Sequence, residues 1–276
     1  MTTLTAQKLG ATVGAEISGV DRDRMLHDDA FPEWCLDTLD ANGALVFRDL
    51  HLDDASQVEF SKRLGTVEIV GEGDPPEIFR VTLDPAKNPV AEYLRGTFDW
   101  HIDGATEDIP IMATVLSAHA VAPVGGETEF ASTYAAFDDL DADEQERCLA
   151  LRVVHTFEAA QRLVNPDPSP KELAWWRKRP AKTHPLVWRH RSGRRSLVLG
   201  ATADHIEGMD VHEGRAYLDD LLERSTRPHR VYRHEWTVGD LVIWDNRGVL
   251  HRACRYDASS PRDMHRTTIA GNEPIQ

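Results

Sequence analysis

The sequence is poor in cysteine, has no long apolar run, and carries few positive charges. Its cysteines, Cys35, Cys148 and Cys254, lie far apart, and no two of them form a CxxC pair. An odd number of separated thiols argues against a disulfide framework and indicates a reducing compartment. No apolar stretch approaches the roughly 20 residues that cross a bilayer, and no basic and apolar leader opens the chain. We therefore expect a cytoplasmic protein without membrane segments.

Positive charge is scarce relative to negative charge. The chain has 31 Lys and Arg against 46 Asp and Glu, which gives a formal net charge of −15. No run of Lys and Arg with interleaved aromatic residues provides the basic surface that phosphate backbones require. We therefore expect no nucleic-acid partner. The same negative field repels small anions at long range, so an anionic ligand would need arginines inside its pocket.

The composition is otherwise that of an ordinary globular protein. Hydrophobic residues make up 41% and charged residues 28% of the 276 residues. No repeat, low-complexity tract or Gly/Ser linker divides the chain, so we predict one domain over residues 1–276. The sequence leaves the formation of a homo-oligomer open.

The first quarter of the chain predicts strands alternating with helices. Apolar residues recur at helical spacing over residues 29–43, and Gly43 is suited to end that helix. The apolar run Ala44–Phe47 predicts a strand. A second helix is expected to begin at Asp53 or Asp54 and to end at Gly65.

From residue 97 onward the sequence is organised in short apolar runs bounded by turn residues. We predict strands in these runs, at 97–102, 113–118, 127–131, 186–189, 197–199, 231–236, 241–244, 249–253 and 264–269. Helical patterns interrupt them at 142–151 and 212–224. Many short strands with few helices favour a mainly β protein with flanking helices and a cupin-like jelly-roll core, which is a double-stranded β-helix.

A long irregular stretch separates the two helical patterns. Three prolines fall within residues 165–170, and the stretch continues through Trp175 and Trp176 to Pro185. Long loops in compact domains commonly cover binding sites. We predict a lid over about residues 157–185.

An H-x-D motif can supply two ligands to one metal, because positions i and i+2 of a strand point to the same side. The motif occurs three times, at residues 27–29, 51–53 and 101–103. The first two copies adjoin expected helix starts, where Asp commonly caps the helix. Only His101 and Asp103 follow a β-prone aromatic run, Thr97–Trp100.

A further histidine, His251, follows a polar turn between two apolar strands. A single histidine in such a place is most often part of the core or its rim. Combined with His101 and Asp103, however, it would complete a set of two His and one carboxylate. Such a set leaves positions open on Fe(II) for a bidentate co-substrate and O₂.

Two arginines, Arg262 and Arg266, follow His251 on an extended segment and share a face. Arginine binds carboxylates through two parallel hydrogen bonds, so one of them could hold the far carboxylate of a diacid whose other end chelates iron. The alternative is a pair of surface ion pairs, which are common in a chain with 46 acidic residues.

In this order, the motifs resemble the taurine dioxygenase and dichlorophenoxyacetate dioxygenase (TauD/TfdA) family of Fe(II)/2-oxoglutarate-dependent dioxygenases. The resemblance covers nearly the whole chain. It rests on four segments, namely an opening hairpin at 9–19, the first ligand motif Trp100–Asp103, the segment 125–130, and the closing motif from Trp244 to His251 with the arginines that follow.

The resemblance implies a metal site and a co-substrate site. Fe(II) would be bound by His101, Asp103 and His251. Thr128 and Arg262 would hold the distal carboxylate of 2-oxoglutarate, which is consumed with O₂ to give succinate and CO₂. Because halogenases of this kind replace the carboxylate ligand with a small residue, Asp103 implies hydroxylation instead.

The resemblance also implies a small acidic primary substrate, held by Arg266. Gly104 has no side chain to crowd the open coordination site, and a bulge in the strand is the alternative reason for a glycine there. The loop around Val70 would shape the substrate pocket. The taurine enzyme has a histidine in that loop, whereas the matching segment Leu64–Gly65 leads here to Val70. An aryloxyalkanoate-like carboxylate is therefore favoured, with a sulfate ester or a sulfonate such as taurine as the alternatives.

Two other classes of protein fit parts of this pattern. A zinc hydrolase also uses two His and one carboxylate with an open position. It would leave the pairing of Thr128 with Arg262 unexplained. A metal-free jelly-roll binding protein would leave the whole triad unexplained. We therefore favour the oxygenase.

Overall fold

The computed structural model describes residues 3–71 and 73–276. The elements of the first half are β1 (Thr5–Lys8), β2 (Ala15–Ser18), α1 (Arg22–His27), α2 (Phe31–Asn42), β3 (Ala44–Phe47), α3 (Asp54–Leu64), β4 (Phe79–Val81), the 3₁₀ helix η1 (Ala91–Phe98), β5 (Ala113–Ala120), β6 (Thr128–Ser132), α4 (Thr133–Asp138) and α5 (Ala142–Ala150). Those of the second half are β7 (Arg152–His155), α6 (Phe157–Val164), α7 (Pro170–Trp176), β8 (Lys182–Pro185), β9 (Val187–Arg189), β10 (Arg195–Leu197), β11 (Ala203–Ile206), α8 (Val211–Ser225), the 3₁₀ helix η2 (Pro228–Arg230), β12 (Val231–His234), β13 (Leu241–Asp245), β14 (Val249–Ala253) and β15 (Asp263–Ile269).

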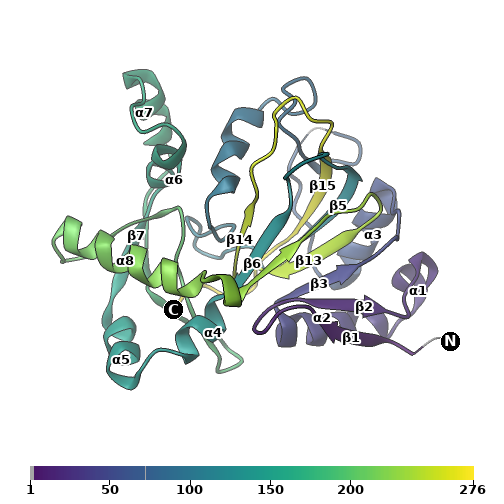
Figure 1. Cartoon of the computed structure of the whole chain (residues 1–276), viewed down its shortest axis with the longest axis horizontal. Coiled ribbons are helices and arrows are strands. Elements are labelled where there is room, and N and C mark those ends of the chain that lie inside the picture. Colours follow the sequence, from purple (N-terminus) through teal and green to yellow (C-terminus); the bar gives the residue numbers. More distant parts are fainter. Residues whose placement is uncertain (1–2, 72) are drawn as a thin grey trace.

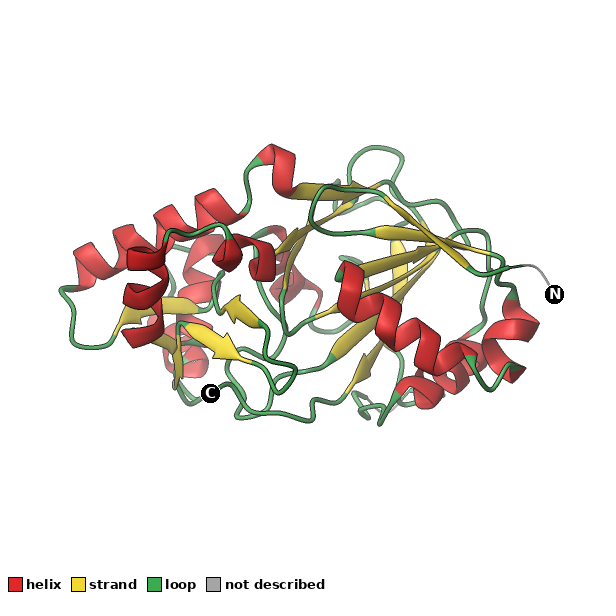
Figure 2. Cartoon of the chain, turned by 90° about the horizontal axis from the view of Figure 1, so that it is seen from below, coloured by secondary structure: helices red, strands yellow, loops and turns green. Residues whose placement is uncertain are grey.

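Two sheets build the centre of the molecule. The major sheet has seven strands in the order β1-β2-β3-β13-β5-β15-β4, and a second sheet has the order β12-β6-β14. Sheets β11-β7-β8 and β10-β9 are smaller. Helices α1 to α3 lie at one end of the molecule and α4 to α8 at the other (Figure 1). Figure 2 shows the strands between these two groups of helices. The arrangement confirms the predicted jelly roll with flanking helices.

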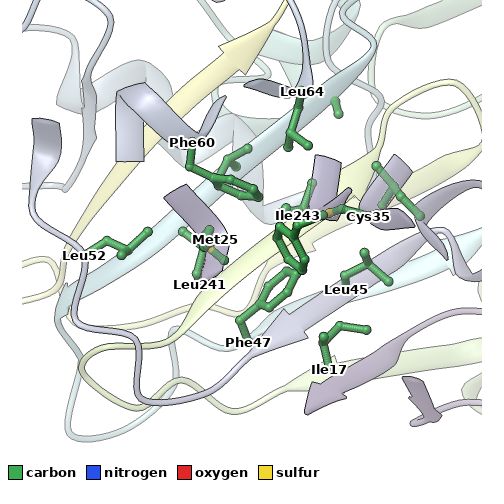
Figure 3. Close-up of a cluster of buried hydrophobic side chains, with 14 of the residues drawn as sticks. Ile17, Met25, Cys35, Leu45, Phe47, Leu52, Phe60, Leu64, Leu241 and Ile243 are labelled. Atoms are coloured by element: carbon green, nitrogen blue, oxygen red, sulfur yellow. The ribbon is translucent and has the colours of Figure 1, made fainter. Parts of the chain in front are cut away.

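Helices α2 and α3 cover the outer face of the major sheet and bury a hydrophobic cluster there. Phe31, Phe47, Phe60 and Ile243 are fully buried in this cluster, which Figure 3 shows. Burial of each such side chain contributes about 1.5–3 kcal/mol. A second cluster, which includes Phe130, fills the space between the two central sheets.

Local signals placed the N-terminal elements correctly. Gly43 ends α2 with φ 71°, a conformation that glycine adopts without strain. The side chain of Asp53 caps α3 by accepting a hydrogen bond from the backbone N–H of Ser56. Strands β1 and β2 form an antiparallel hairpin, whose turn and second strand lie in the expected segment 9–19 and whose first strand precedes it. The short helix α1, which His27 ends, was not predicted.

The strand predicted over residues 97–102 is wrong. Residues 91–98 form η1, and a single isolated bridge between His101 and His251 is the pairing that follows it. Helix η1 packs against the helices of the predicted lid, since the ring of Tyr93 stacks on Trp175 at 4.8 Å. These contacts outweigh the β propensity of the aromatic run.

The segment 165–185, predicted to be irregular, contains α7 and β8, and the predicted lid at 157–185 also includes α6. Its prolines do not prevent helix formation, because Pro170 occupies the first turn of α7, where no backbone N–H is needed. Ser169 and Glu172 form a capping box around this helix start. The sequence therefore carried a helix signal within the proline-rich stretch.

Within the described residues, no helix is both long and apolar enough to cross a bilayer. All three cysteines are free thiols. Cys35 and Cys148 are buried, and Cys254 is half-buried.

Candidate metal centre and substrate pocket

His101 and His251 face one another across an isolated antiparallel bridge. The backbone N–H of each donates to the carbonyl of the other at 3.0 Å. Their rings lie 4.1 Å apart, centroid to centroid. The carboxylate of Asp103 lies between them, with Oδ1 3.7 Å from Nε2 of His101 and Oδ2 3.7 Å from Nε2 of His251. The three side chains therefore converge. Asp103 reaches this point through the turn that follows the bridge, whereas the sequence predicted that alternation along a strand would place it there.

Gly104 forms that turn. Its φ is +79°, and a Cβ atom there would lie 2.9 Å from the backbone nitrogen of Ile111. The turn therefore requires glycine, both for its left-handed conformation and for the close approach of the chain. This is a structural reason for Gly104 that differs from the open coordination site expected from the sequence.

The protonation of the triad suits a divalent metal. Nδ1 of His101 lies 2.8 Å from the backbone carbonyl of Asp99, which only accepts, so Nδ1 donates there and Nε2 is the nitrogen left to bind a metal. Burial, with the nearby His101, lowers the pKa of His251 to about 3, so this ring is neutral at pH 7. Burial disfavours the charged form of Asp103, but His251, Arg266 and His101 outweigh it and hold the pKa of Asp103 at about 2.

The spacing of the triad also suits a metal. One ligand atom from each of His101, Asp103 and His251 lies within 4.8 Å of the other two. The carboxylate–imidazole distances of 3.7 Å are too long for hydrogen bonds, but they match ligands that share an ion through bonds of about 2.0–2.2 Å. The donor set of two imidazoles and one carboxylate is that of Fe(II) oxygenases.

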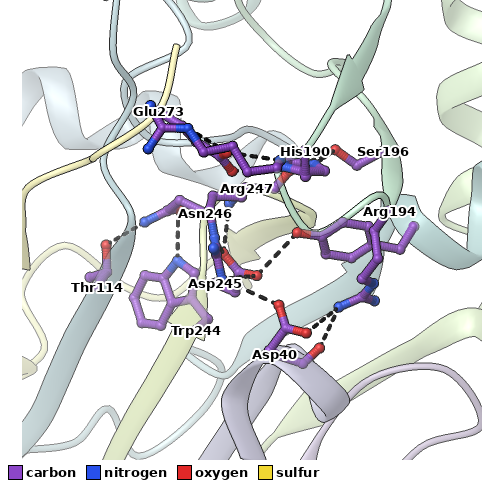
Figure 4. Close-up of polar contacts among 12 residues, drawn as sticks. Asp40, Thr114, His190, Arg194, Ser196, Trp244, Asp245, Asn246, Arg247 and Glu273 are labelled. Carbon is purple, nitrogen blue, oxygen red and sulfur yellow. Dashed lines mark hydrogen bonds and ion pairs between the residues drawn. The ribbon is translucent and has the colours of Figure 1, made fainter. Parts of the chain in front are cut away.

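A chain of hydrogen bonds supports the carboxylate of Asp103, and the residues of this chain were not predicted from the sequence. The hydroxyl of Thr114 on β5 donates to Oδ2 of Asp103 at 3.1 Å. The amide of Asn246 donates to the hydroxyl oxygen of Thr114 at 2.8 Å and accepts from Nε1 of Trp244 at 3.1 Å (Figure 4). The polar turn after β13 thus determines the position of the carboxylate.

The residues on either side of Asn246 belong to a partly buried ionic network. Asp245 is fully buried, and its carboxylate accepts from Nε of Arg247 at 2.8 Å and from the hydroxyl of Tyr134 at 3.2 Å (Figure 4). Arg247 also reaches Asp40 of α2, which pairs with Arg194. Because β14 and His251 follow the turn after β13 directly, the network positions the third member of the triad.

Arg262 lies in the same cavity, 3% exposed, beside a glycine-rich turn. Its Nε donates to the carbonyl of Gly126 at 3.1 Å, and its guanidinium lies 4.9 Å from the ring centroid of Tyr256. Burial lowers the pKa of Arg262. Among the described residues, no carboxylate forms an ion pair with it. A buried guanidinium without an anion is costly, so this position favours a bound carboxylate.

Thr128 lines the cavity with its hydroxyl already oriented. Nε1 of Trp236 donates to the hydroxyl oxygen of Thr128 at 2.9 Å. This bond uses an acceptor site of the oxygen and leaves the hydroxyl proton free to donate to a ligand. Trp236 was not predicted as a site residue, because nothing in its sequence context indicates this contact.

Arg266 approaches the triad from β15. Its Nη1 lies 3.7 Å from Oδ2 of Asp103, and its guanidinium lies 4.8 Å from the ring centroid of Phe79. Its buried Nε has no hydrogen-bond partner among the described residues. Arg266 and Arg262 line one cavity together with the triad, as the shared face predicted. Apolar side chains, among them Val81 and Leu116, form part of its wall.

Val70 is not among the residues that line this cavity. It is half-buried in the loop between α3 and β4, where its backbone N–H donates to the carbonyl of Pro76 at 3.0 Å. Its contact with a substrate stays a prediction.

The jelly roll, the triad between its sheets and the oriented threonine and arginine beside it define a 2-oxoglutarate-dependent non-haem iron dioxygenase. The chain belongs to the family described as "Taurine catabolism dioxygenase TauD, TfdA family", whose profile matches residues 5–268.

Individual relatives agree with this assignment. The chain is 37% identical to the alpha-ketoglutarate-dependent 2,4-dichlorophenoxyacetate dioxygenase of Burkholderia sp. (strain RASC), over 84% of this chain and 83% of the relative. It is 31% identical to the alpha-ketoglutarate-dependent sulfate ester dioxygenase of Pseudomonas putida, over 99% and 91% of the two chains. The solved structure of AAD-2 in complex with Mn(II) and N-oxalylglycine has a TM-score of 0.85 and 33% identity, and covers 99% of this chain and 100% of that one. The zinc hydrolase and the metal-free binding protein are therefore disfavoured.

Proposed function

We propose that this dioxygenase hydroxylates a small acidic substrate, with an aryloxyalkanoate-like carboxylate as the favoured class and a sulfate ester as the second. When bound, Fe(II) and 2-oxoglutarate supply O₂ activation, with insertion of one oxygen atom into a C–H bond and release of succinate and CO₂. His101, Asp103 and His251 would bind the metal. Arg262 and Thr128 would bind the distal carboxylate of 2-oxoglutarate.

The observation that carries this proposal is the presence of two arginines in one cavity in different surroundings. Arg262 is buried and without an acidic partner, which suits a resident carboxylate. Arg266 lies beside Asp103 and Phe79, with an unpaired Nε. An anionic substrate at Arg266 would therefore be held beside the metal, with its apolar body near an aromatic ring. Holding the reacting carbon beside the metal in this way makes the reaction step effectively unimolecular and so lowers its barrier.

The relatives support the substrate class. They are named for 2,4-dichlorophenoxyacetate and for sulfate esters, and both compounds carry an acid near a carbon–oxygen bond. Hydroxylation of the carbon attached to that oxygen gives a hemiacetal-like product that collapses. The net result would be cleavage of the carbon–oxygen bond.

We also propose that residues 157–185 act as a lid. Helix α6 begins at Phe157, whose ring lies 6.5 Å from that of Tyr93, and α7 adds the stack of Trp175 on the same ring. Both helices thus contact η1, which contributes Thr97 to the wall of the cavity. A movement of this helix pair would change access to the triad.

The experiment is a panel of aryloxyacetates, aryloxypropionates, alkyl sulfates, sulfonates and amino acids, each scored for substrate-dependent succinate production. The neutral amides of the acids with the highest turnover serve as controls, because they differ from the acids in lacking the negative charge. We expect Arg266→Gln to raise KM for the acid and to leave the apparent constant for 2-oxoglutarate nearly unchanged. Equal turnover of an acid and its amide, in the wild type and in the variant alike, would refute the anionic substrate and leave the reaction class intact.

A further inference from the structure

The outer face of the major sheet carries a second set of two histidines and one carboxylate. Asp54 begins α3, His119 lies on β5 and His265 on β15, and one ligand atom from each lies within 4.8 Å of the other two. His265 directly precedes Arg266, so the two side chains project from opposite faces of the sheet. The cluster is therefore separated from the catalytic cavity by the thickness of the sheet.

The two imidazoles face the same carboxylate oxygen. Nδ1 of His265 lies 2.5 Å and Nε2 of His119 lies 3.9 Å from Oδ1 of Asp54. The rings are stacked, with centroids 3.7 Å apart and an angle of 19° between their planes. The side chain of His265 is 11% exposed, whereas those of His119 and Asp54 are 32% and 31% exposed. The cluster is thus preformed, and one side of it is open to solvent.

The charges around the cluster leave it with one free carboxylate. Asp263 lies 3.7 Å from Nε2 of His265, but Arg80 and Lys87 already pair with it. Asp54 is therefore the carboxylate that serves both histidines. Two stacked imidazolium rings would repel one another, and burial together with His265 lowers the pKa of His119. A neutral imidazole is the form that binds metals.

The protons of the cluster lie where a metal would replace them. The hydroxyl of Ser117 donates to Oε1 of Gln57 at 2.6 Å, so its oxygen accepts from Nε2 of His119 at 3.2 Å. Nδ1 of His265 donates to the carboxylate of Asp54. Nδ1 of His265 thus directs its proton at Asp54, and Nε2 of His119, whose proton is donated to Ser117, lies 3.9 Å from the same carboxylate oxygen. The buried amide of Gln57 also donates to the backbone carbonyl of His265 at 3.0 Å, which fixes that strand against α3.

We propose that Asp54, His119 and His265 form a second divalent-metal site, distinct from the catalytic triad. Nitrogen and carboxylate ligands favour a borderline ion such as Zn²⁺ or Co²⁺ over Ca²⁺ or Mg²⁺, which prefer oxygen. Three protein ligands leave a fourth position for water on the open side. The ion would tie the start of α3 to β5 and β15, and so would stabilise the strand that carries Arg266.

The test counts metal ions in the full-length chain. Zn²⁺ binding is measured by calorimetry and by metal analysis after dialysis, and Co²⁺ binding by visible absorption. We expect two equivalents in the wild type, one in His101→Ala, one in His119→Gln and none in the double variant. His229→Gln, which removes an exposed histidine in η2, is the matched control and should keep both equivalents.

A second measurement separates this site from loose surface binding. In His101→Ala, Zn²⁺ should raise the melting temperature, and adding either His119→Gln or Asp54→Asn should abolish that rise. Both substitutions are at half-exposed side chains, so the variants are expected to fold. A single equivalent in the wild type, or a second equivalent that survives His119→Gln, would overturn the proposal.

Discussion

The hydroxyl of Thr114 donates a hydrogen bond of 3.1 Å to Oδ2 of Asp103, and the same hydroxyl oxygen accepts a hydrogen bond from the amide of Asn246. This bond both orients the carboxylate and stabilises its charge. In metal sites, loss of such a supporting partner typically costs about 10- to 100-fold in metal affinity or activity. We therefore expect Thr114→Val, which preserves the shape of the side chain, to weaken Fe(II) binding by about that factor. Anaerobic titration with Fe(II) measures it.

Thr268 provides the control for this prediction. It pairs with Thr114 across β5 and β15 and is equally buried, and no residue that the structure describes hydrogen-bonds to its hydroxyl. Thr268→Val should therefore leave Fe(II) affinity unchanged. Equal losses in the two variants would show that packing, and not the bond to Asp103, determines the affinity.

The three H-x-D motifs of the sequence allow an internal comparison. His101→Ala should abolish iron-dependent turnover, because one metal ligand is lost while the surrounding core stays filled. His27→Ala should have almost no effect, since His27 is an exposed residue at the end of α1. Succinate formation and a melting curve are measured for both variants. If both fold and lose activity equally, His101 is not a ligand.

The sequence allowed the triad to be predicted because its members lie in long, ordered motifs. It did not reveal how the triad is assembled. The run Thr97–Trp100 has the composition of a strand, but its first two residues belong to η1, which packs on α6 and α7, and the pairing with β14 is one bridge at His101. Local propensity carries no information on such contacts.

Supporting residues could not be predicted for the same reason. Thr114 is one threonine in an apolar strand, and its role depends on Asn246, which is remote in sequence. Likewise, Asp54, His119 and His265 share no motif, because three separate elements bring them together. Their proximity is therefore apparent only from the three-dimensional structure.

Arg262 should determine the affinity for 2-oxoglutarate. Hydrogen bonds to a charged partner contribute about 1.5–3 kcal/mol, which corresponds to roughly 10- to 150-fold in binding. We expect Arg262→Gln to weaken 2-oxoglutarate by about that factor and to affect the primary substrate far less. The metal-to-ligand absorption band of the anaerobic complex reports this binding. An unchanged titration would assign the distal carboxylate to another residue.

Buried histidines should make the fold sensitive to acid. His155 on β7 is fully buried, with Nδ1 3.0 Å from the hydroxyl of Thr202. Its Nε2 has no partner within residues 3–71 and 73–276. Burial, with the nearby His184, lowers the pKa of His155 to about 3. Its pKa in the unfolded chain is about 6.5. Protonation therefore favours the unfolded chain.

The contribution of His155 to the free energy of unfolding is fully present above pH 6.5 and is lost as the pH falls from about 6.5 toward 3. At pH 5 the loss amounts to about 2 kcal/mol, since each pH unit below the unfolded pKa costs about 1.4 kcal/mol. His155→Leu keeps the site filled and removes this dependence. The free energy of unfolding in urea is measured for both proteins at pH 7.5 and pH 5. In the difference between the two proteins, the contributions of the carboxylates and other histidines that they share cancel. We expect the stability advantage of the wild type over the variant to shrink by about 2 kcal/mol on acidification. A difference independent of pH would mean that His155 takes up its proton as readily in the folded protein as in the unfolded chain.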